Sequence, residues 1–151
     1  MNYQREIRIA ASPERVFAFH ESPGALERLT PPWERVVVES GGDSLRVGSR
    51  VVIKMRLGPF VRRWVAEHTA YDPPRLFADR QVSGPFARWE HRHEFVDDGA
   101  GGTILRDSVE FEPPCGMLGR IFLRGFVLYK LDRMFAYRHE LTKRLVETNE
   151  F

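Results

Sequence analysis

The C-terminal stretch of the sequence, residues 113–150, reads as one helix long enough to cross a whole β-sheet. At about 100° per residue, its apolar side chains fall on one narrow stripe, as in a helix that packs one face on a core. We expect the helix to begin within a few residues of Gly116 and to end close to Val146. The stripe consists of Val127, Leu131, Met134, Leu141 and Leu145.

The first turns of this helix carry a different apolar face. Leu118, Phe122, Phe126 and Tyr129 lie nearly opposite the later stripe. Gly125 lies between the two patterns, and glycine is a poor helix former. We therefore expect the helix to bend or break near Gly125.

Arg138 falls in the middle of the apolar stripe. A buried guanidinium cannot lose its proton, and an unpaired buried charge costs several kcal/mol or more. We therefore expect Arg138 to make a bidentate contact with an inward-facing carboxylate, either Asp79 or Asp107. Further expected hydrogen-bond partners are Gln81, His91 and His93.

The chain before this helix reads mostly as strands that alternate apolar and polar residues. The pattern predicts strands over residues 3–10, 33–39, 50–57, 60–71, 76–83, 86–96 and 103–112. Ser12-Pro13 predicts a short helix after the first strand, and a second short helix precedes Pro31-Pro32. This order is typical of an α+β fold, in which a curved antiparallel sheet of about six or seven strands wraps round the long helix. We expect an internal cavity between the sheet and the helix.

The strand over residues 86–96 divides most clearly into two faces. Its charged face should lie in solvent, so the other face should line the concave side of the sheet. The charged residues are Arg88, Glu90, Arg92 and Glu94, and the expected inner residues are Trp89, His91, His93 and Phe95.

The inner faces of two other strands depend on register. If the Gly58-Pro59 loop has two residues, Trp64 and His68 share a face with Ile53 and Met55. A slip of one residue would bring Glu67 inward instead. In the strand over residues 76–83 we expect Asp79, rather than Arg80, to point inward, because Arg138 needs a carboxylate and Phe77 shares the face of Asp79.

These faces together predict a polar ligand-binding wall inside the fold. Aromatic side chains supply apolar area, and Arg138 with the histidines supplies orientation, as is usual in concave sites. The predicted ligand-binding residues are Met55, Trp64, His68, Asp79, Gln81, Trp89, His91, His93, Asp107, Met134, Phe135 and Arg138.

His91 and His93 allow three interpretations. They could chelate a metal with a third ligand such as His68, His20 or Asp107. A histidine beside Asp107 could act as a general base. Alternatively, the imidazoles, Asp107 and Arg138 form a hydrogen-bond network that shapes the cavity. Because the sequence fixes neither a third ligand nor catalytic geometry, we expect no metal, no cofactor and no assigned catalytic residue.

Composition excludes several classes of protein. A chain of 151 residues fits one domain, here residues 1–151. A net charge of +2, from 23 basic and 21 acidic residues, predicts no nucleic-acid partner. No apolar run approaches the roughly 20 residues of a membrane span, and no signal peptide precedes the first strand. With one cysteine, Cys115, we expect a cytoplasmic protein.

The opening of the long helix is both basic and apolar. Arg120, Arg124 and Lys130 lie beside Ile121, Phe122, Leu123 and Phe126. This pattern is compatible with a membrane surface, but the amphipathic face is short. We expect an entrance lid to the cavity instead.

Several segments resemble the START-like, or SRPBCC, superfamily over the entire chain. They are ASPERVFAFH, LTPPWE, GPFARWEHRHEF, TILRDSVEFEPP and MFAYRHE. The chain is similar to small bacterial cyclase/dehydrase-like ligand-binding proteins, which occur alone or fused ahead of an epimerase-like domain. The resemblance implies the helix-grip fold with a hydrophobic cavity, but little about chemistry. Because the chain ends at Phe151, we expect no epimerase-like domain in it.

The expected function is therefore binding of a small hydrophobic or aromatic molecule in the internal cavity, by a monomer or a dimer. One alternative is an enzyme of the cyclase/dehydratase kind, with His91 or His93 as acid-base group and Asp107 orienting it. Another is a regulatory module that binds a partner protein, which an exposed apolar patch around Phe122 and Phe126 would favour.

Overall fold

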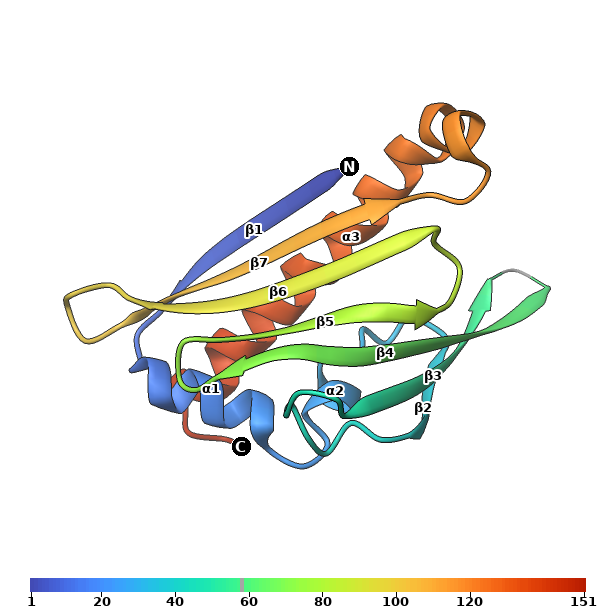
Figure 1. Ribbon diagram of the computed structural model, residues 1–151. Coiled ribbons are helices and arrows are strands. Elements are labelled where there is room, and N and C mark those ends of the chain that lie inside the picture. Colours follow the sequence, from blue (N-terminus) through green and yellow to red (C-terminus); the bar gives the residue numbers. More distant parts are fainter. Residues whose placement is uncertain (58) are drawn as a thin grey trace.

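The computed structural model describes residues 1–57 and 59–151, without the side chain of Leu57. The predicted order of one strand, two short helices, further strands and one long helix is confirmed (Figure 1). The elements are β1 (Asn2–Ile9), α1 (Pro13–Glu21), α2 (Ala25–Arg28), β2 (Val36–Ser40), β3 (Arg50–Leu57), β4 (Phe60–Asp72), β5 (Leu76–Ser83), β6 (Arg88–Asp97), β7 (Thr103–Glu112) and α3 (Gly116–Glu147).

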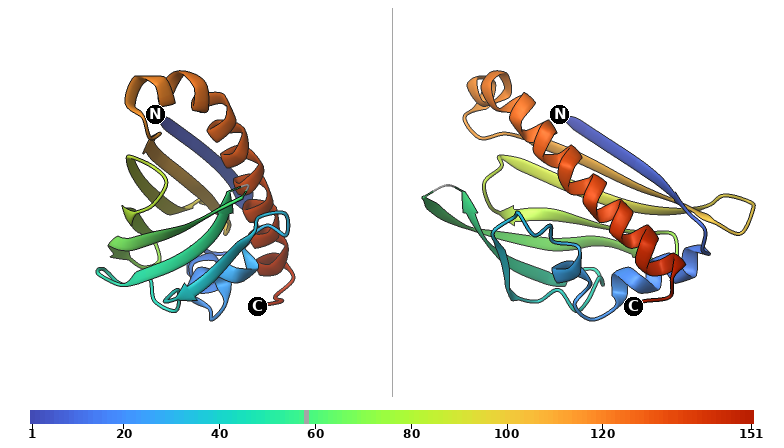
Figure 2. Two further views of the ribbon diagram at one scale, coloured as in Figure 1. Left: turned by 90° about the vertical axis from the view of Figure 1, so that its right-hand side faces the viewer. Right: turned by 180° about the vertical axis from the view of Figure 1, so that it is seen from behind.

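The strands form one antiparallel sheet, which confirms the predicted helix-grip architecture. Over the described residues the sheet has seven strands in the order β1-β7-β6-β5-β4-β3-β2. The first and last strands along the chain are therefore neighbours, with Tyr3 opposite Val109. The side and back views show that the sheet is curved, that α3 crosses its concave side, and that α1 and α2 cover one end (Figure 2).

Helix α3 has the predicted ends, since it begins at Gly116 and ends at Glu147. The helix is continuous through Gly125, so of the two predicted alternatives, a bend or a break, there is no break. Its first turns nevertheless run at an angle to the rest of the helix, in agreement with the alternative of a bend (Figure 2).

The buried stripe of α3 differs from the predicted one. The buried side chains follow the spacing of Leu131, Phe135, His139, Thr142 and Val146. His139, not Arg138, thus occupies the centre of the stripe. Relative to the prediction, the helix is rotated about its axis by about 100°, which is the angle between successive residues. The remaining predicted stripe residues, Val127, Met134, Leu141 and Leu145, lie half-buried at its edges.

The predicted faces of the strands are confirmed. On β6, Trp89, His91 and Phe95 are buried while Arg88 and Glu90 are exposed. Across the β3–β4 pair, Ile53 is opposite Trp64 and Leu57 is opposite Phe60, which is the register of a two-residue loop. Gly58 of that loop lies outside the described residues. On the outer face, the carboxylate of Glu67 binds Arg50 and Arg80.

Strand β2 is shorter than predicted. It begins at Val36 rather than Trp33, because the chain first makes a turn in which the Glu34 amide donates to the Pro31 carbonyl. The Trp33 ring packs on Tyr137 of α3 at a centroid distance of 5.3 Å.

Among the described residues, the apolar interior forms two clusters. One lies under α1 and includes Phe17, Phe19, Phe95, Leu105 and Val146. The other lies further along α3 and consists of Trp89, Val109, Phe111, Leu131 and Phe135. Since β6, β7 and α3 each contribute to both clusters, the residues between them on these elements form a layer of their own.

Two phenylalanines of α3 test this assignment of burial. Phe135 is 1% exposed and Phe122 is 76% exposed. We expect Phe135→Ala to lower the free energy of unfolding by about 3–5 kcal/mol, because it leaves a cavity in the core. Phe122→Ala, the matched control, should change it by less than about 0.5 kcal/mol. Urea unfolding of the two variants measures the difference, and equal losses would contradict the burial assignment.

Candidate functional site

A polar layer separates the two apolar clusters. It contains His91 and His93 from β6, Asp107 from β7 and His139 from α3, with Asp79 from β5 beside them. On β6 and β7 the flanking inward positions, Trp89, Phe95, Leu105 and Val109, are apolar, so the strand period places the polar side chains at one level of the interior. The fold thus brings together residues that are distant in the sequence, the most distant being Asp79 and His139, which are 60 positions apart.

Asp107 is the centre of this layer and is 3% exposed. Its Oδ1 atom lies 2.8 Å from His91 Nε2, and its Oδ2 atom lies 2.5 Å from His139 Nε2. His93 Nδ1 lies 2.6 Å from Oδ1, but too obliquely to form a hydrogen bond. Burial raises the pKa of Asp107, but the charge of His93 and the hydrogen bonds of His139 and His91 outweigh it. The pKa of Asp107 therefore lies well below its usual value.

His93 lies between two carboxylates. Besides Asp107, it faces Asp79, whose Oδ2 atom is 3.9 Å from His93 Nε2. Burial lowers the pKa of His93, but the negative charges of Asp107 and Asp79 prevail and raise it to about 8. Burial likewise raises the pKa of Asp79, but His93 and His91 outweigh it, and the net direction is downward. At neutral pH this centre therefore holds a protonated imidazole between two ionised aspartates.

The other titrating histidines are biased toward the neutral form. Burial lowers the pKa of His91 and His68, and it lowers that of His20 to about 4. His20 Nδ1 lies 2.8 Å from the Val16 carbonyl oxygen, and His68 Nδ1 lies 3.1 Å from Ser49 Oγ. His20, His91, His93 and His139 thus face one interior region.

His139 is the residue of the candidate site that the sequence interpretation missed. It is 2% exposed and binds the central carboxylate. The signal was present, because Leu131, Phe135 and His139 are spaced four apart and therefore share a helix face. The stripe centred on Arg138 concealed it, since the two alternatives differ by a single residue.

The expected pairing of Arg138 with a carboxylate is wrong. Arg138 Nε donates to the Leu29 carbonyl at 3.1 Å, and the guanidinium lies 5.7 Å from the centroid of the Phe135 ring. No carboxylate of the described residues forms an ion pair with it. The reason is the rotation of α3, which directs His139 at Asp107 in its place. Burial lowers the pKa of Arg138.

Gln81 is also not a partner of Arg138. Its Nε2 atom donates to the Phe86 carbonyl at 2.8 Å, and the Phe86 amide donates to Oε1 at 3.3 Å. The side chain thereby fixes the turn between β5 and β6.

The remaining predicted site residues lie on the inner face. Trp64 of β4 and Trp89 of β6 contact each other edge to face at a centroid distance of 4.9 Å, and the Trp64 Nε1 atom is buried without a partner among the described residues. These aromatic rings and their neighbours form the apolar end of the predicted wall. Among these residues, His68, Trp89 and Phe135 are buried, while Met55, Trp64 and Met134 are half-buried.

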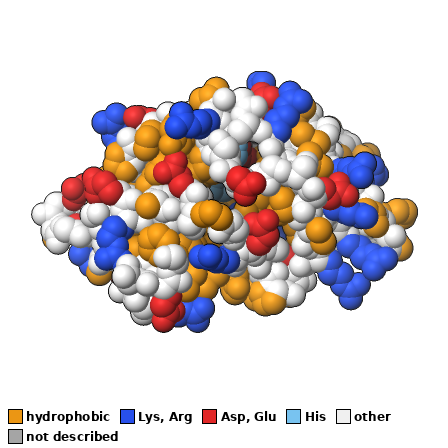
Figure 3. Space-filling view, turned by 90° about the horizontal axis from the view of Figure 1, so that it is seen from below, with side chains coloured by type: hydrophobic (Ala, Val, Ile, Leu, Met, Phe, Trp, Pro, Cys, Tyr) orange, Lys and Arg blue, Asp and Glu red, His pale blue; other side chains and the backbone are white. Residues whose placement is uncertain are grey.

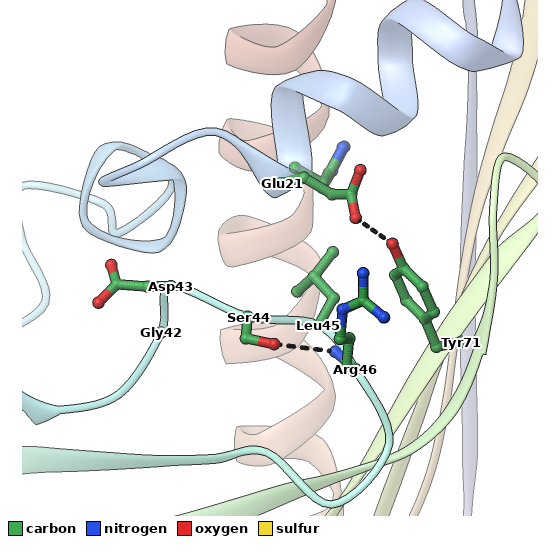
Figure 4. A pocket seen from close by; sticks show the side chains of 8 residues that line it. Glu21, Gly42, Asp43, Ser44, Leu45, Arg46 and Tyr71 are labelled. Carbon is green, nitrogen blue, oxygen red and sulfur yellow. Dashed lines mark hydrogen bonds between the residues drawn. The ribbon is translucent and has the colours of Figure 1, made fainter.

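A pocket of about 120 Å³ lies at the surface beside α1, and His20 on its wall is the residue nearest to the polar layer. At its rim the Tyr71 hydroxyl donates to Glu21 at 2.5 Å, as Figure 4 shows, and the Arg46 guanidinium lies 5.7 Å from the centroid of the Tyr71 ring. His20 also lines this pocket, and its ring lies 6.2 Å from that of His93. In the view of Figure 3, histidine atoms are visible at the bottom of a hollow in the surface. We call this opening the His20 mouth; it is lined by His20, Glu21, Gly42, Asp43, Ser44, Leu45, Arg46 and Tyr71.

A second, larger pocket of about 610 Å³ lies against the first turns of α3. Met117, Arg120, Ile121 and Arg124 contribute to it from the helix, and Met1 contributes from the other end of the chain.

In the part of the chain that the structure describes, no helix combines the length and the apolar character that crossing a membrane would require.

The pKa of His93 leads to a prediction about stability. His93 binds its proton more tightly in the folded state, with a pKa of about 8, than at the ordinary value of 6.5. Its stabilising effect is complete below pH 6.5 and is lost as the pH rises through about 8. We expect this loss to lower the free energy of unfolding by about 2 kcal/mol. His93→Gln should remove it, as urea unfolding across this pH range can show; parallel pH profiles of the two proteins would contradict the assignment.

A family model described as "Polyketide cyclase / dehydrase and lipid transport" matches residues 2–147. No curated protein matches the chain. Solved structures do match, among them the protein TTHA0849 from Thermus thermophilus, with a TM-score of 0.75, 19% identity and full coverage of both chains.

Two other solved structures are also similar. Norcoclaurine synthase from Thalictrum flavum, in complex with dopamine and hydroxybenzaldehyde, has a TM-score of 0.74 and 16% identity, over 100% of this chain and 88% of its own. A nucleoside-diphosphate sugar epimerase from Corynebacterium glutamicum has a TM-score of 0.74 and 26% identity, over 94% of this chain but only 28% of its own. The match of the family model over nearly the whole sequence shows that this chain belongs to the polyketide cyclase/dehydrase and lipid transport family.

Proposed function

We propose that the protein binds a small aromatic or otherwise apolar molecule that carries an oxygen-bearing, preferably anionic, group in the interior between the sheet and α3. The observation that carries this proposal is the polar layer around Asp107, which is enclosed between two apolar clusters and has His20 of the His20 mouth beside it. Buried polar groups are expensive, and a core needs none of them for stability alone. Their concentration beside an aromatic wall is the composition of a ligand site.

The aromatic end of the interior supports the apolar part of the ligand. Trp64, Phe86 and Trp89 contact one another with centroid distances of 4.9 to 5.7 Å. Phe135 of α3 lies 5.1 Å from the His91 ring and so joins this wall to the polar layer. An aromatic ligand placed here would gain edge-to-face contacts as well as buried area.

Two cationic groups support the choice of an anionic ligand group. The described residues give Arg138 one hydrogen bond, from Nε to the Leu29 carbonyl, so its terminal nitrogens have donors to spare. His93, with its pKa raised to about 8, can donate a further proton. A ligand carboxylate or phenolate bound between them would take the place that the sequence assigned to Asp79 or Asp107.

The similar proteins are compatible with this chemistry. The norcoclaurine synthase structure contains dopamine and hydroxybenzaldehyde, which are both small aromatic molecules. The family description names polyketide cyclases and lipid transport, and these imply hydrophobic ligands.

An aromatic anion, 8-anilinonaphthalene-1-sulfonate, tests the proposal. Arg138→Met should weaken its binding by roughly tenfold or more, because a hydrogen bond to a charged group is worth about 1.5–3 kcal/mol. Arg144→Met, an exposed arginine on the same helix, is the matched control and should bind like the wild type. Probe fluorescence and quenching of the interior tryptophans both report the affinity.

Binding of the probe to the exposed apolar side chains at the start of α3, such as Phe122, would contradict the proposal. If Phe122→Ser abolishes probe binding while Arg138→Met leaves it unchanged, the probe occupies the surface and the interior site is rejected. If Arg138→Met weakens probe binding instead, the interior site stands, and native mass spectrometry of protein purified from its own host would identify its natural ligand.

A second candidate is an enzyme of the cyclase/dehydratase kind, which the hydrogen bond of 2.8 Å between His91 and Asp107 favours. This carboxylate could hold the imidazole in one orientation while a proton moves, although proton transfer also requires a substrate within reach. Under this candidate, His91→Gln should abolish conversion of the natural ligand while keeping its binding. If the wild-type protein releases the ligand chemically unchanged, the enzyme candidate is rejected.

A third candidate is a module that binds a partner protein. The specific observation is the exposure of Phe122 and Phe126, at 76% and 62%. Together with Met117, Leu118 and Ile121, which are also exposed, they form an apolar patch at the start of α3.

A further inference from the structure

Three potential metal-ligand atoms converge in the polar layer. They are Asp79 Oδ2, His91 Nδ1 and His93 Nε2, and all lie within 4.8 Å of one another. Asp79 comes from β5 and the two histidines from the adjacent strand β6, where Asp79 is directly opposite His91. Sequence reasoning considered His68, His20 and Asp107 as the third ligand, whereas the strand pairing brings in Asp79.

The distances within this group do not fit a hydrogen-bonded network. Asp79 Oδ2 lies 3.7 Å from His91 Nδ1 and 3.9 Å from His93 Nε2. Both are longer than a hydrogen bond between nitrogen and oxygen, which spans about 2.7–3.2 Å. They are compatible with ligands on opposite sides of a cation, since zinc binds nitrogen and carboxylate oxygen at about 2.0–2.2 Å. Small inward movements of the side chains would complete the coordination.

Asp107 lies beside the other nitrogen of each histidine. His91 Nε2 makes a hydrogen bond to Asp107 Oδ1, and His93 Nδ1 lies 2.6 Å from the same oxygen. A proton on His91 Nε2 leaves the lone pair of His91 Nδ1 facing Asp79. His93 offers Nε2 on the same side once metal binding displaces its second proton. For His91 this is the carboxylate–histidine–metal arrangement, in which an outer carboxylate fixes the tautomer and orientation of the ligand. His139 in turn holds the second oxygen of Asp107.

We propose that Asp79, His91 and His93 form a binding site for a first-row divalent cation such as Zn²⁺. Two imidazoles and one carboxylate suit zinc and its neighbours rather than calcium or magnesium, which prefer sets of oxygen ligands. Three protein ligands leave a position for water or for an oxygen atom of a bound molecule. His20 connects the site to the surface, because it lines the His20 mouth and its ring lies 6.2 Å from that of His93.

The proposal does not depend on the organic ligand, because the metal alone is the probe. Purified wild-type protein, freed of metal with a chelator and dialysed against Zn²⁺ at about pH 7.5, should retain one equivalent that Asp79→Asn does not. Asp79→Asn keeps the shape of the side chain and should weaken Zn²⁺ binding by more than about 100-fold, since even outer partners contribute about 10–100-fold. Asp97→Asn, an exposed aspartate on β6, is the matched control and should bind like the wild type.

Cobalt(II) gives a second measurement on the same proteins. A four-coordinate Co²⁺ site with imidazole and carboxylate ligands should show visible absorption bands in the wild type and in Asp97→Asn, but not in His93→Gln. Circular dichroism shows whether each variant keeps its fold, and two independent ligand variants keep the test decisive if one of them unfolds. Failure of the wild type to retain Zn²⁺, or unchanged affinity in both ligand variants, would overturn the proposal.

Retention of 8-anilinonaphthalene-1-sulfonate by the metal-free protein separates this proposal from the proposed function. Probe binding without Zn²⁺ binding would reject the metal site alone, leaving the protonated His93 between Asp79 and Asp107 as the description of this layer. Zn²⁺ binding without probe binding would reject the interior ligand site alone.

Discussion

The buried carboxylate of Asp107 is the group on which the interior of this protein depends. An isolated ionised carboxylate at 3% exposure would cost far more than the fold could supply, so its position requires partners. The histidines that satisfy it come from a neighbouring strand and from α3, and its pKa is correspondingly held low. The contact with His139 therefore fixes both the distance and the rotation of the long helix against the sheet. Removing one partner would leave a buried charge uncompensated, which is why the layer should act as a unit.

This constraint also organises the candidate site. The polar layer interrupts what would otherwise be one continuous core and leaves apolar clusters on either side of it. One cluster surrounds α1 and the His20 mouth, and the other provides the tryptophans of the aromatic wall. A ligand in the interior would thus meet aromatic surface, a cationic pair and an anionic centre within a short distance. Asp107 holds α3 through His139 and would also orient the proposed metal ligand His91, so one carboxylate serves both the fold and the proposed site.

Much of the fold could be predicted because alternation along a strand is a local property. The bounds of β3, β5 and β7 agree with the prediction, and so do the two faces of β6, since one face carries charges that cannot be buried. The short loop between β3 and β4 fixed the register that places Trp64 and His68 inside. β2 begins later than predicted, because a turn before Val36 depends on a backbone hydrogen bond that the residue pattern does not reveal.

The sequence by itself determined the order of the elements, the inward face of each strand and the presence of several titratable groups in the interior. Only the tertiary structure decided which of these groups meet. Arg138 and His139 differ by about 100° of helix rotation, which a broad apolar stripe leaves open. The contact between His139 and Asp107, 32 residues away along the chain, decides which of the two residues faces the sheet. Asp79 likewise becomes the third potential metal ligand only through its pairing across the sheet with His91. Periodicity fixes a direction for each side chain, whereas a contact also requires the distance and rotation between packed elements.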